Sequence, residues 1–301
     1  MGGMELDVKL AKAETFLATH ARVLDRHRFA VATGRDASAD ALFAALAAYR
    51  NPDGGFGWGL EPDLRSPESQ PAGALHAFEV LEEARSDPGG LAPALCDWLT
   101  SVTLPDGGLP FALPVAEPAG TAPWWRGADP SASSLHITAA VAAAAHRVAR
   151  YDKAVRDHAW LARVTAFCLR EIARDARMTA YELRYSLAFL DAIQDAMPET
   201  AAHLERLAAR LPEDGTLPVE GGLEDEVLRP LDISPWPGRP LRHRLPEAVV
   251  AEDLRRLAAG QRDDGDWVVD FAAQSPASAL EWRGHSTVNA VRILLAHQAG
   301  E

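Results

Sequence analysis

The sequence predicts an all-α fold, namely an α/α toroid of about six helical hairpins that comprises residues 1–301 as a single domain. Three observations support this prediction. A short aspartate–glycine motif recurs at a spacing near fifty residues. An amphipathic helical run precedes each copy, and a more apolar helical run follows most copies. Sustained strand-like alternation and β-hairpin motifs are absent from the sequence.

The recurring motif first occurs as "NPDGGFGW" and returns as "LPDGGLPF", "LPEDGTLP" and "QRDDGDW". Its marker aspartates are separated by 53, 108 and 50 residues, so one copy is missing from the middle interval. A glycine after an aspartate can adopt the positive φ that ends a helix, and the carboxylate can accept hydrogen bonds from turn amides. We therefore interpret four aspartates as turn residues and not as catalysts: Asp53, Asp106, Asp214 and Asp264.

The helical runs before the motifs are amphipathic and are predicted to form an outer layer of helices. They cover residues 39–50, 91–102, 199–210 and 247–260. The runs after the motifs are more apolar on all sides, as expected of buried inner helices. They cover residues 69–84, 131–149 and 284–298, and Pro71 suits the first turn of its helix.

The rest of the chain supplies further helices. The region without a motif contains a helix pair at residues 154–173 and 179–193, and a first helix is expected at about residues 5–30. Residues 219–245 leave room for only a short inner helix. A closed ring is favoured over an open solenoid, because an open stack would expose the apolar inner helices to solvent.

Composition excludes several classes of function. The net charge of −13 argues against nucleic acid, whose phosphates would be repelled. No apolar run approaches the roughly 20 residues that span a bilayer, and the N-terminus lacks a signal-peptide core, so we expect a cytoplasmic protein. Cys96 and Cys168 lie in apolar helical runs and are expected in the core. The basic segment at residues 238–244 is more typical of a solvated loop than of a phosphate site.

Two of the motifs resemble the repeats of a known superfamily. "QRDDGDW" resembles the Gln-Trp repeat of squalene-hopene cyclases and of protein prenyltransferase β subunits, and "NPDGGFGW" is similar to the same repeat without its glutamine. This resemblance implies the terpenoid cyclase/protein prenyltransferase α/α toroid. The stretches "NPDGGFGWGLEPDLRSPESQP" and "EWRGHST" also look like a bacterial prenyltransferase-like family of roughly this length, whose reaction is not established.

The motifs that carry the chemistry of that superfamily are absent from this sequence. The Asp-x-Asp-Asp motif that protonates an alkene does not occur, and neither does the Asp-Asp-x-x-Asp motif that holds Mg²⁺. His285 falls near the zinc-ligating histidine of protein prenyltransferases, but the companion Asp-x-Cys is missing. We therefore expect no metal and no cofactor, and catalysis of a metal-independent kind.

The loop after the first motif, "LEPDLRSPESQ", contains the leading candidates for catalysis. Glu61 and Asp63 flank a proline, and either carboxylate could act as proton donor or base while Arg65 fixes the charge of its partner. His76 and His136 occupy matching positions near the starts of two inner helices and could face one cavity. The alternative for these residues is structural, as parts of an ordered loop or as hydrogen-bonded core histidines.

Polar and aromatic residues near the predicted cavity are candidates for binding a substrate. Tryptophans suit a greasy substrate, a carbocation or a sugar face, and they equally suit a plug in one mouth of the ring. Glu182 lies inside an apolar helix and is expected to have a partner or a ligand, while Arg283 is expected to anchor Glu61 or Asp63. The substrate-binding candidates are Arg65, Gln70, Trp124, Trp125, Glu182, Tyr185, Trp236, Trp282, Arg283 and His285.

The leading functional hypothesis is a toroid that encloses an isoprenoid-like or other apolar metabolite. Glu61, Asp63 and a histidine would carry out metal-independent acid–base cyclisation or isomerisation. A carbohydrate-active enzyme with paired acids and tryptophan platforms is the second hypothesis, and a binding module without catalysis is the third. The expected partner is a small apolar metabolite, with no nucleic acid and no membrane span. The sequence leaves both the reaction and the formation of a homo-oligomer open.

Overall fold

The computed structural model describes residues 9–36, 38–87 and 89–298. These residues form fourteen α-helices, three short 3₁₀ helices and one two-stranded ladder, which confirms the predicted all-α class. The chain divides into two compact units. Unit 1 comprises the described residues up to Ala45 and from Leu207 onward, and unit 2 comprises Leu46–Arg206. The single domain over residues 1–301 and the closed ring stay predictions.

The units differ in how their helices follow one another along the chain. Unit 1 contains α1 (Leu10–His20), α2 (Val23–Ala32), β1 (Leu217–Pro218), β2 (Val227–Leu228), α12 (Pro230–Ile233), η3 (Arg242–Arg244), α13 (Glu247–Ala259) and α14 (Pro276–Gln298). Unit 2 contains α4 (Pro71–Ala84), α5 (Leu91–Val102), η1 (Pro118–Gly120), α6 (Pro123–Arg126), α7 (Leu135–Val148), α8 (Lys153–Arg156), α9 (Ala159–Ala173), α10 (Ala180–Ile193) and η2 (Pro198–Thr200). Helices α3 (Asp40–Ala47) and α11 (Ala201–Ala208) lie where the chain passes between the units.

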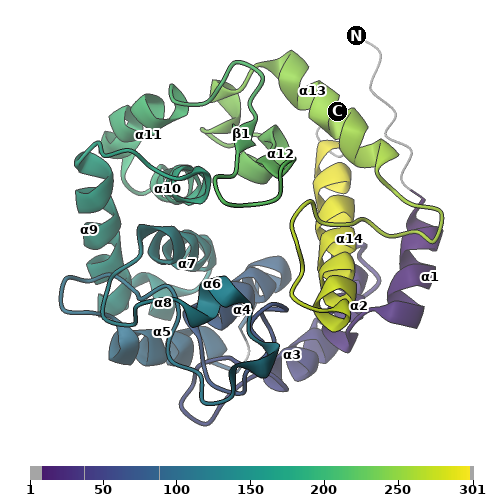
Figure 1. Ribbon diagram of the computed structural model, residues 1–301, viewed down its shortest axis with the longest axis horizontal. Helices are drawn as coiled ribbons and strands as arrows, with labels where there is room; N and C mark the ends of the chain where they lie inside the picture. Colours follow the sequence, from purple (N-terminus) through teal and green to yellow (C-terminus); the bar gives the residue numbers. More distant parts are fainter. Residues whose placement is uncertain (1–8, 37, 88, 299–301) are drawn as a thin grey trace. The chain divides into compact units, whose positions relative to one another are not determined.

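Helix α7 is the centre of unit 2. It packs between α4 and α10, and α9 packs against both α7 and α5 (Figure 1). Most of α7 from Ile137 to Ala145 is buried alanine, whose small side chains let the neighbouring helices approach closely. The outer α9 contributes Trp160, which stacks on Phe78 of α4 with 6.4 Å between ring centroids. The predicted inner helices at residues 69–84, 131–149 and 179–193 are thus present as α4, α7 and α10.

Helix α14 is the centre of unit 1, where it packs against α1, α2 and α13 (Figure 1). Its buried residues Val291 and Leu294 share a core with Phe16 of α1 and Leu254 of α13. Trp267 of the fourth motif joins this core, and its Nε1 donates to the Leu257 carbonyl at 2.7 Å. The indole therefore joins the loop after α13 to the helix itself.

The marker aspartates form the turns that the sequence predicts. In the turns of Asp53, Asp106 and Asp214 the carboxylate accepts a hydrogen bond from the backbone N–H two residues later. The glycine after each aspartate has φ between +69° and +101°, the left-handed region that glycine adopts without steric cost. Two carboxylates also accept a bond from a serine hydroxyl before the next helix, from Ser69 to Asp53 at 2.8 Å and from Ser133 to Asp106 at 2.6 Å. The motif thus joins the end of one helix to the start of the next.

The sequence predicts one continuous first helix at about residues 5–30, and this prediction is wrong because the helix is interrupted. The described part is two helices, α1 and α2, with an extended backbone at Ala21; residues 5–8 lie outside the described residues. Nη2 of Arg26 donates to the freed Ala21 carbonyl at 3.1 Å, and Nε of Arg22 pairs with Asp25 at 2.9 Å. These side-chain contacts replace the helical bonds that the break removes.

Two further expectations need correction. Residues 219–245 supply the four-residue α12, as expected of a short helix, but β1 and β2 form an antiparallel ladder that the sequence analysis missed. Each strand has two residues, too few for an alternating pattern to appear. The last inner helix was predicted over residues 284–298, whereas α14 begins earlier, at Pro276.

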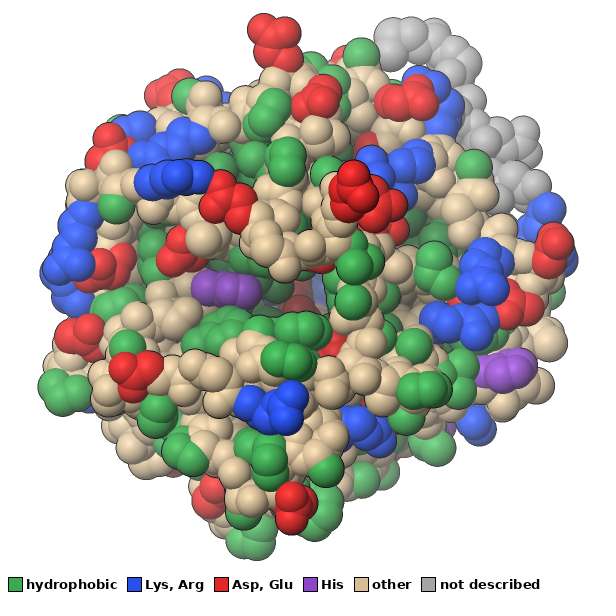
Figure 2. Space-filling model, viewed as in Figure 1, with side chains coloured by type: hydrophobic (Ala, Val, Ile, Leu, Met, Phe, Trp, Pro, Cys, Tyr) green, Lys and Arg blue, Asp and Glu red, His purple; other side chains and the backbone are tan. Residues whose placement is uncertain are grey.

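Surface charge is mixed on the face shown in Figure 2, where acidic, basic and hydrophobic side chains are interspersed. The net charge of −13 is therefore not gathered into one area of this face. In the described part of the chain, no helix has both the length and the apolar character needed to span a membrane.

Removing a marker carboxylate should destabilise unit 2. Asp106→Ala loses the bonds from the Gly108 N–H and the Ser133 hydroxyl, so we expect the free energy of unfolding to fall by about 1–2 kcal/mol. Asp106→Asn keeps an acceptor oxygen and should lose less. Urea denaturation of both variants checks this, and equal stability of Asp106→Ala and the unmodified protein would contradict the role of the turn.

Candidate functional site

Glu61 and Asp63 lie in a loop of unit 2 that a second loop holds in place. The N–H of Arg65 donates to the Gly120 carbonyl at 3.1 Å, and the N–H of Ala122 donates to the Asp63 carbonyl at 2.9 Å. Glu61 and Asp63 are only 7% and 2% exposed, although both are acids. The side chain of Arg65 is exposed. The paired loops therefore bury two carboxylates that the sequence predicted as a functional pair.

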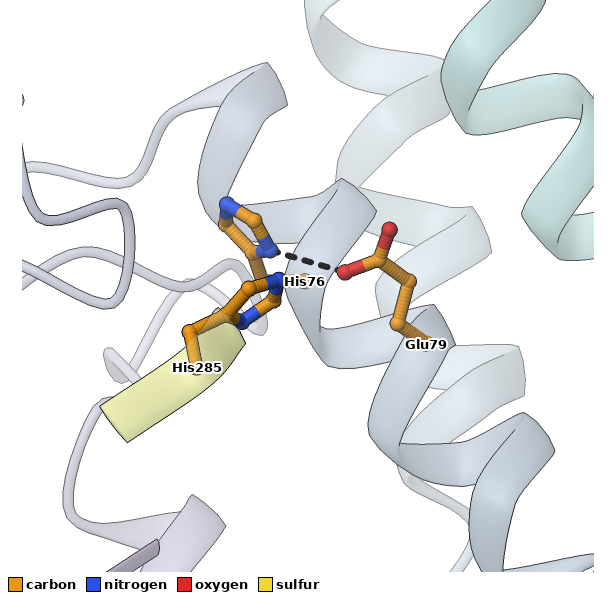
Figure 3. Close-up of side chains that lie close together, drawn as sticks. All are labelled: His76, Glu79 and His285. Atoms are coloured by element: carbon orange, nitrogen blue, oxygen red, sulfur yellow. Dashed lines mark hydrogen bonds and ion pairs between the residues drawn. The ribbon is translucent and has the colours of Figure 1, made fainter. Parts of the chain in front are cut away.

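Glu61 contacts a second predicted catalytic residue, His76. Its Oε2 lies 2.8 Å from His76 Nε2, and the other ring nitrogen, Nδ1, lies 2.8 Å from Oε2 of Glu79. His76 and Glu79 are three residues apart on α4 and point toward each other (Figure 3). The imidazole is thus held between two carboxylates, because both of its nitrogens face an acceptor.

The charge state of His76 follows from these two contacts. Burial by itself lowers the pKa of His76, but the nearby charges and hydrogen bonds of Glu79 and Glu61 raise it to about 9. At neutral pH the ring is therefore an imidazolium that donates at both nitrogens. The side chains of His76 and Glu61 are 10% and 9% exposed, whereas that of Glu79 is 30% exposed. Glu79 is the member of the group that a ligand can reach.

A five-residue segment, Leu109 to Leu113, joins the starts of α4 and α7. The side-chain amide of Gln70, which precedes α4, donates to the Leu113 carbonyl at 3.1 Å and accepts from its N–H at 2.8 Å. At the other end, Leu109 accepts from the Ser134 N–H at 2.8 Å and donates to Thr138 Oγ1 at 2.8 Å. An extended segment of this length spans at most about 14 Å. The segment therefore connects the N-terminal ends of α4 and α7.

His136 lies in a cluster of aromatic rings at the start of α7. Its ring is nearly parallel to those of Tyr181 and Tyr185, with centroid distances of 5.2 Å and 5.1 Å and interplanar angles of 2° and 20°. Phe111, from the middle of the joining segment, lies 5.1 Å from His136 and stacks on Trp125 at 4.4 Å. Each of the five rings is partly exposed, so the cluster presents an aromatic surface.

His136 is the electrostatic opposite of His76. Burial lowers its pKa and the positive charge of Arg184 lowers it further, to about 4. Its position in the first turn of α7, near the positive end of the helix dipole, also disfavours a charged ring. No described group forms a hydrogen bond with either ring nitrogen of His136, and neither nitrogen is buried. The ring is thus a neutral imidazole that is available to a ligand.

The other unit 2 candidates differ in what they contact. Gln70 is 1% exposed, and its side-chain amide is hydrogen-bonded to the backbone of Leu113. Trp124, on α6, is 46% exposed. Glu182 forms a capping box with Thr179 at the start of α10, so its expected partner is the helix terminus. Tyr185 belongs to the aromatic cluster, and the guanidinium of Arg184 lies 4.8 Å from its ring centroid. The structure brings together Trp125, His136 and Tyr185, and it separately joins Glu61 to His76.

The remaining candidates lie in unit 1 and are engaged there. Arg283 forms ion pairs with Asp264 and Asp266, and its expected contact with Glu61 or Asp63 stays a prediction. Its charge is already balanced by the fourth motif, in which burial raises the pKa of Asp266 although Arg283 opposes this shift.

His285, Trp282 and Trp236 have partners in unit 1 as well. His285 Nδ1 lies 2.9 Å from Nη1 of Arg28, a guanidinium that is 2% exposed. The ring of Trp282 meets that of His285 edge-on at 5.4 Å. Trp236 lies under the guanidinium of Arg292, 4.9 Å from its ring centroid. These contacts are those of packed structural residues.

Sequence reasoning missed three residues of the site, namely Glu79, Phe111 and Tyr181. Glu79 follows His76 by three residues on one helix, a spacing that brings side chains together and could have identified it. Tyr181 precedes Tyr185 by four residues and has the same signal. Phe111 lies in an irregular loop, and no sequence pattern relates it to His136.

The donor set of unit 2 limits how it could hold a metal. An ion could bind Nδ1 of His76 and Glu79 only in place of the proton that they share, with Glu61 orienting the ring from Nε2. Cys96 and Cys168 are fully buried, as predicted, and burial raises the pKa of both thiols. Neither is preformed as a thiolate ligand.

The chain matches no known protein-family model, and no curated protein matches it. The resemblance to terpenoid cyclases and protein prenyltransferases therefore depends on the motifs alone.

The stability that His76 provides should depend on pH. Because its pKa is about 9 in the folded protein and 6.5 without partners, its contribution of about 3 kcal/mol is present below pH 6.5 and is lost between pH 6.5 and 9. Urea denaturation should therefore show that His76→Gln is much less stable than the unmodified protein at pH 6.5 and nearly equal to it at pH 9. A difference that stays constant over this range would contradict the imidazolium.

His136 should have the opposite dependence on pH. Its pKa is about 4 in the folded protein, so the unfolded chain takes up the proton first and stability falls as pH decreases from 6.5 toward 4. In His136→Phe this part of the acid sensitivity should disappear, since phenylalanine does not titrate. Thermal unfolding of the two proteins across this range checks the prediction, and parallel curves would contradict it.

Proposed function

We propose that this protein is an enzyme that binds a small, mainly apolar metabolite of isoprenoid type at unit 2 and carries out acid–base chemistry on it. The proposal depends on one observation: His76 is hydrogen-bonded at both nitrogens, to Glu61 and to Glu79. At neutral pH most molecules of a protein with an ordinary surface histidine have that side chain deprotonated, whereas His76 is protonated in most molecules. A retained proton next to a partly exposed carboxylate is the arrangement that a general acid requires.

Glu79 is the residue through which this proton would reach a substrate. Both N–H groups of His76 are already directed at carboxylates, so the ring itself has no free donor. The proton can instead pass from Nδ1 to Oε2 of Glu79, which leaves a neutral acid beside a neutral imidazole. Glu79 then protonates the substrate, and its restored charge attracts the cation that forms.

The aromatic cluster supports an apolar substrate. The rings of Phe111, Trp125, Tyr181 and Tyr185 pack well against hydrocarbon. Most of the surface of the cluster is contributed by its aromatic rings, and its polar atoms include the His136 nitrogens, two tyrosine hydroxyls and the Arg184 guanidinium. A sugar would need many hydrogen-bond partners, so the carbohydrate hypothesis has less support than the isoprenoid-like metabolite.

The two histidines suit the two halves of an acid–base reaction. The environment of His76 raises its pKa to about 9 and that of His136 lowers its pKa to about 4. A pair of like groups whose pKa values are pushed apart is typical of an acid and a base in one site. His136 is then the proton acceptor that completes an isomerisation or cyclisation.

One observation favours another of the hypotheses, a binding module without catalysis. Such a module predicts that both histidines are satisfied by neighbouring groups, and His76 meets this condition. His136 does not meet it, since its nitrogens have no hydrogen-bond partner among the described residues.

Native mass spectrometry of the protein purified from its own host tests the ligand. We expect a retained apolar compound, and a retained sugar would contradict the proposal.

Conversion of the retained compound, followed by chromatography and mass spectrometry, tests the chemistry. Glu79→Gln and Glu61→Gln should lower the rate by about 100-fold or more, because each removes a carboxylate that is hydrogen-bonded to His76. Asp63→Asn should also lower the rate if this second buried acid takes part, as the sequence predicts. Glu83→Gln, one turn further along α4, is the matched control and should convert the compound at the unmodified rate. Unaltered rates in folded Glu61→Gln and Glu79→Gln would rule out the proposed role.

A further inference from the structure

We propose that the aromatic cluster around His136 recognises a planar ring that carries an acidic hydroxyl group, as in a phenol or an enol. This inference deepens the proposed function, on which it rests, because it names the chemical group by which the metabolite is held. It concerns binding, and it does not require that Glu79 protonates the ligand.

The geometry of the rings favours a flat ligand. The planes of His136 and Tyr181 are within 2° of parallel, and those of Tyr181 and Tyr185 are within 19°. Phe111 and Trp125 form a second pair within 14° of parallel, and Phe111 is tilted by 48° from His136. A planar ring can continue such a stack with full contact on one face, whereas a puckered saturated ring makes fewer contacts.

The nitrogens of His136 favour a ligand that donates a hydrogen bond. A neutral imidazole has one bare nitrogen, which is a strong acceptor, and His136 is neutral across the physiological range. A ligand without a donor would cover this nitrogen and remove it from water, which costs free energy. Recognition through a hydroxyl group avoids that cost.

The charge near His136 favours an acidic hydroxyl over an ammonium group. Arg184, whose guanidinium lies over Tyr185, is close enough to lower the pKa of His136. The same positive charge repels a cationic ligand and stabilises negative charge on an oxygen hydrogen-bonded to the ring. A phenol or enol oxygen carries more of that charge than an aliphatic alcohol does.

Three probe compounds, titrated into the full-length protein, separate the contribution of a planar ring from that of an acidic hydroxyl group. 2-Naphthol is planar and has an acidic hydroxyl, 2-methoxynaphthalene is planar and has none, and decahydro-2-naphthol keeps a hydroxyl on a saturated ring. Isothermal calorimetry should rank 2-naphthol as the tightest, with each of the other two weaker by about tenfold, the loss expected for one hydrogen bond or one stacked ring.

Two variants assign the effect to this cluster. His136→Phe keeps a flat ring and removes the nitrogens, so 2-naphthol and 2-methoxynaphthalene should bind it equally. His243→Phe, at an exposed histidine of unit 1, is the matched control and should keep the preference for 2-naphthol. Tyr185→Leu should weaken both planar probes while circular dichroism stays unchanged.

The proposal is overturned if 2-methoxynaphthalene binds as tightly as 2-naphthol, if the saturated alcohol binds as tightly as the planar one, or if no probe binds. It is also overturned if His136→Phe retains the preference. Its failure is distinct from failure of the proposed function, because Glu79→Gln should leave probe binding unchanged and abolish only conversion of the metabolite.

Discussion

The aspartate–glycine turn is the constraint on which the helix pairs depend. In unit 2 the carboxylates of Asp53 and Asp106 accept a bond from the turn amide and a second bond from the serine that precedes the next helix. One side chain therefore sets where one helix ends and where the next begins. A glycine with positive φ follows each aspartate, because another residue would strain the turn. This arrangement lets α4 and α7 enter side by side with their functional residues in the first turns.

Much of the fold could be predicted because local sequence patterns indicate where its helices begin and end. The spacing of the motif gave the helix pairs, and the alanine-rich run of residues 131–149 predicted the buried α7. The break at Ala21 was not predictable, because it depends on side chains of Arg22 and Arg26 that replace backbone bonds and leave the apolar period intact. The ladder of β1 and β2 is too short to have a period of its own.

The site was predictable in part for the same reason. Glu61 and His76 were found as residue types that suit proton transfer, but their contact is a tertiary one that no spacing encodes. Glu182 was predicted as a buried charge in need of a partner, and that partner is the start of its own helix. The ion pairs of Arg283 with Asp264 and Asp266 were not predicted, because these two acids were already assigned to a turn. A pattern identifies chemistry, whereas packing decides which groups meet.

The way in which the segment from Leu109 to Leu113 is anchored affects which ligands the aromatic cluster can select. It is held by paired backbone bonds at Gln70 and again at Ser134 and Thr138, and Phe111 is midway between these anchors. The backbone that carries Phe111 is held on both sides, so the position of this part of the surface is set before a ligand binds. A preorganised surface binds a ligand of complementary shape with higher affinity than a ligand that requires the surface to rearrange. Discrimination at this surface is then a matter of shape, established when the chain folds.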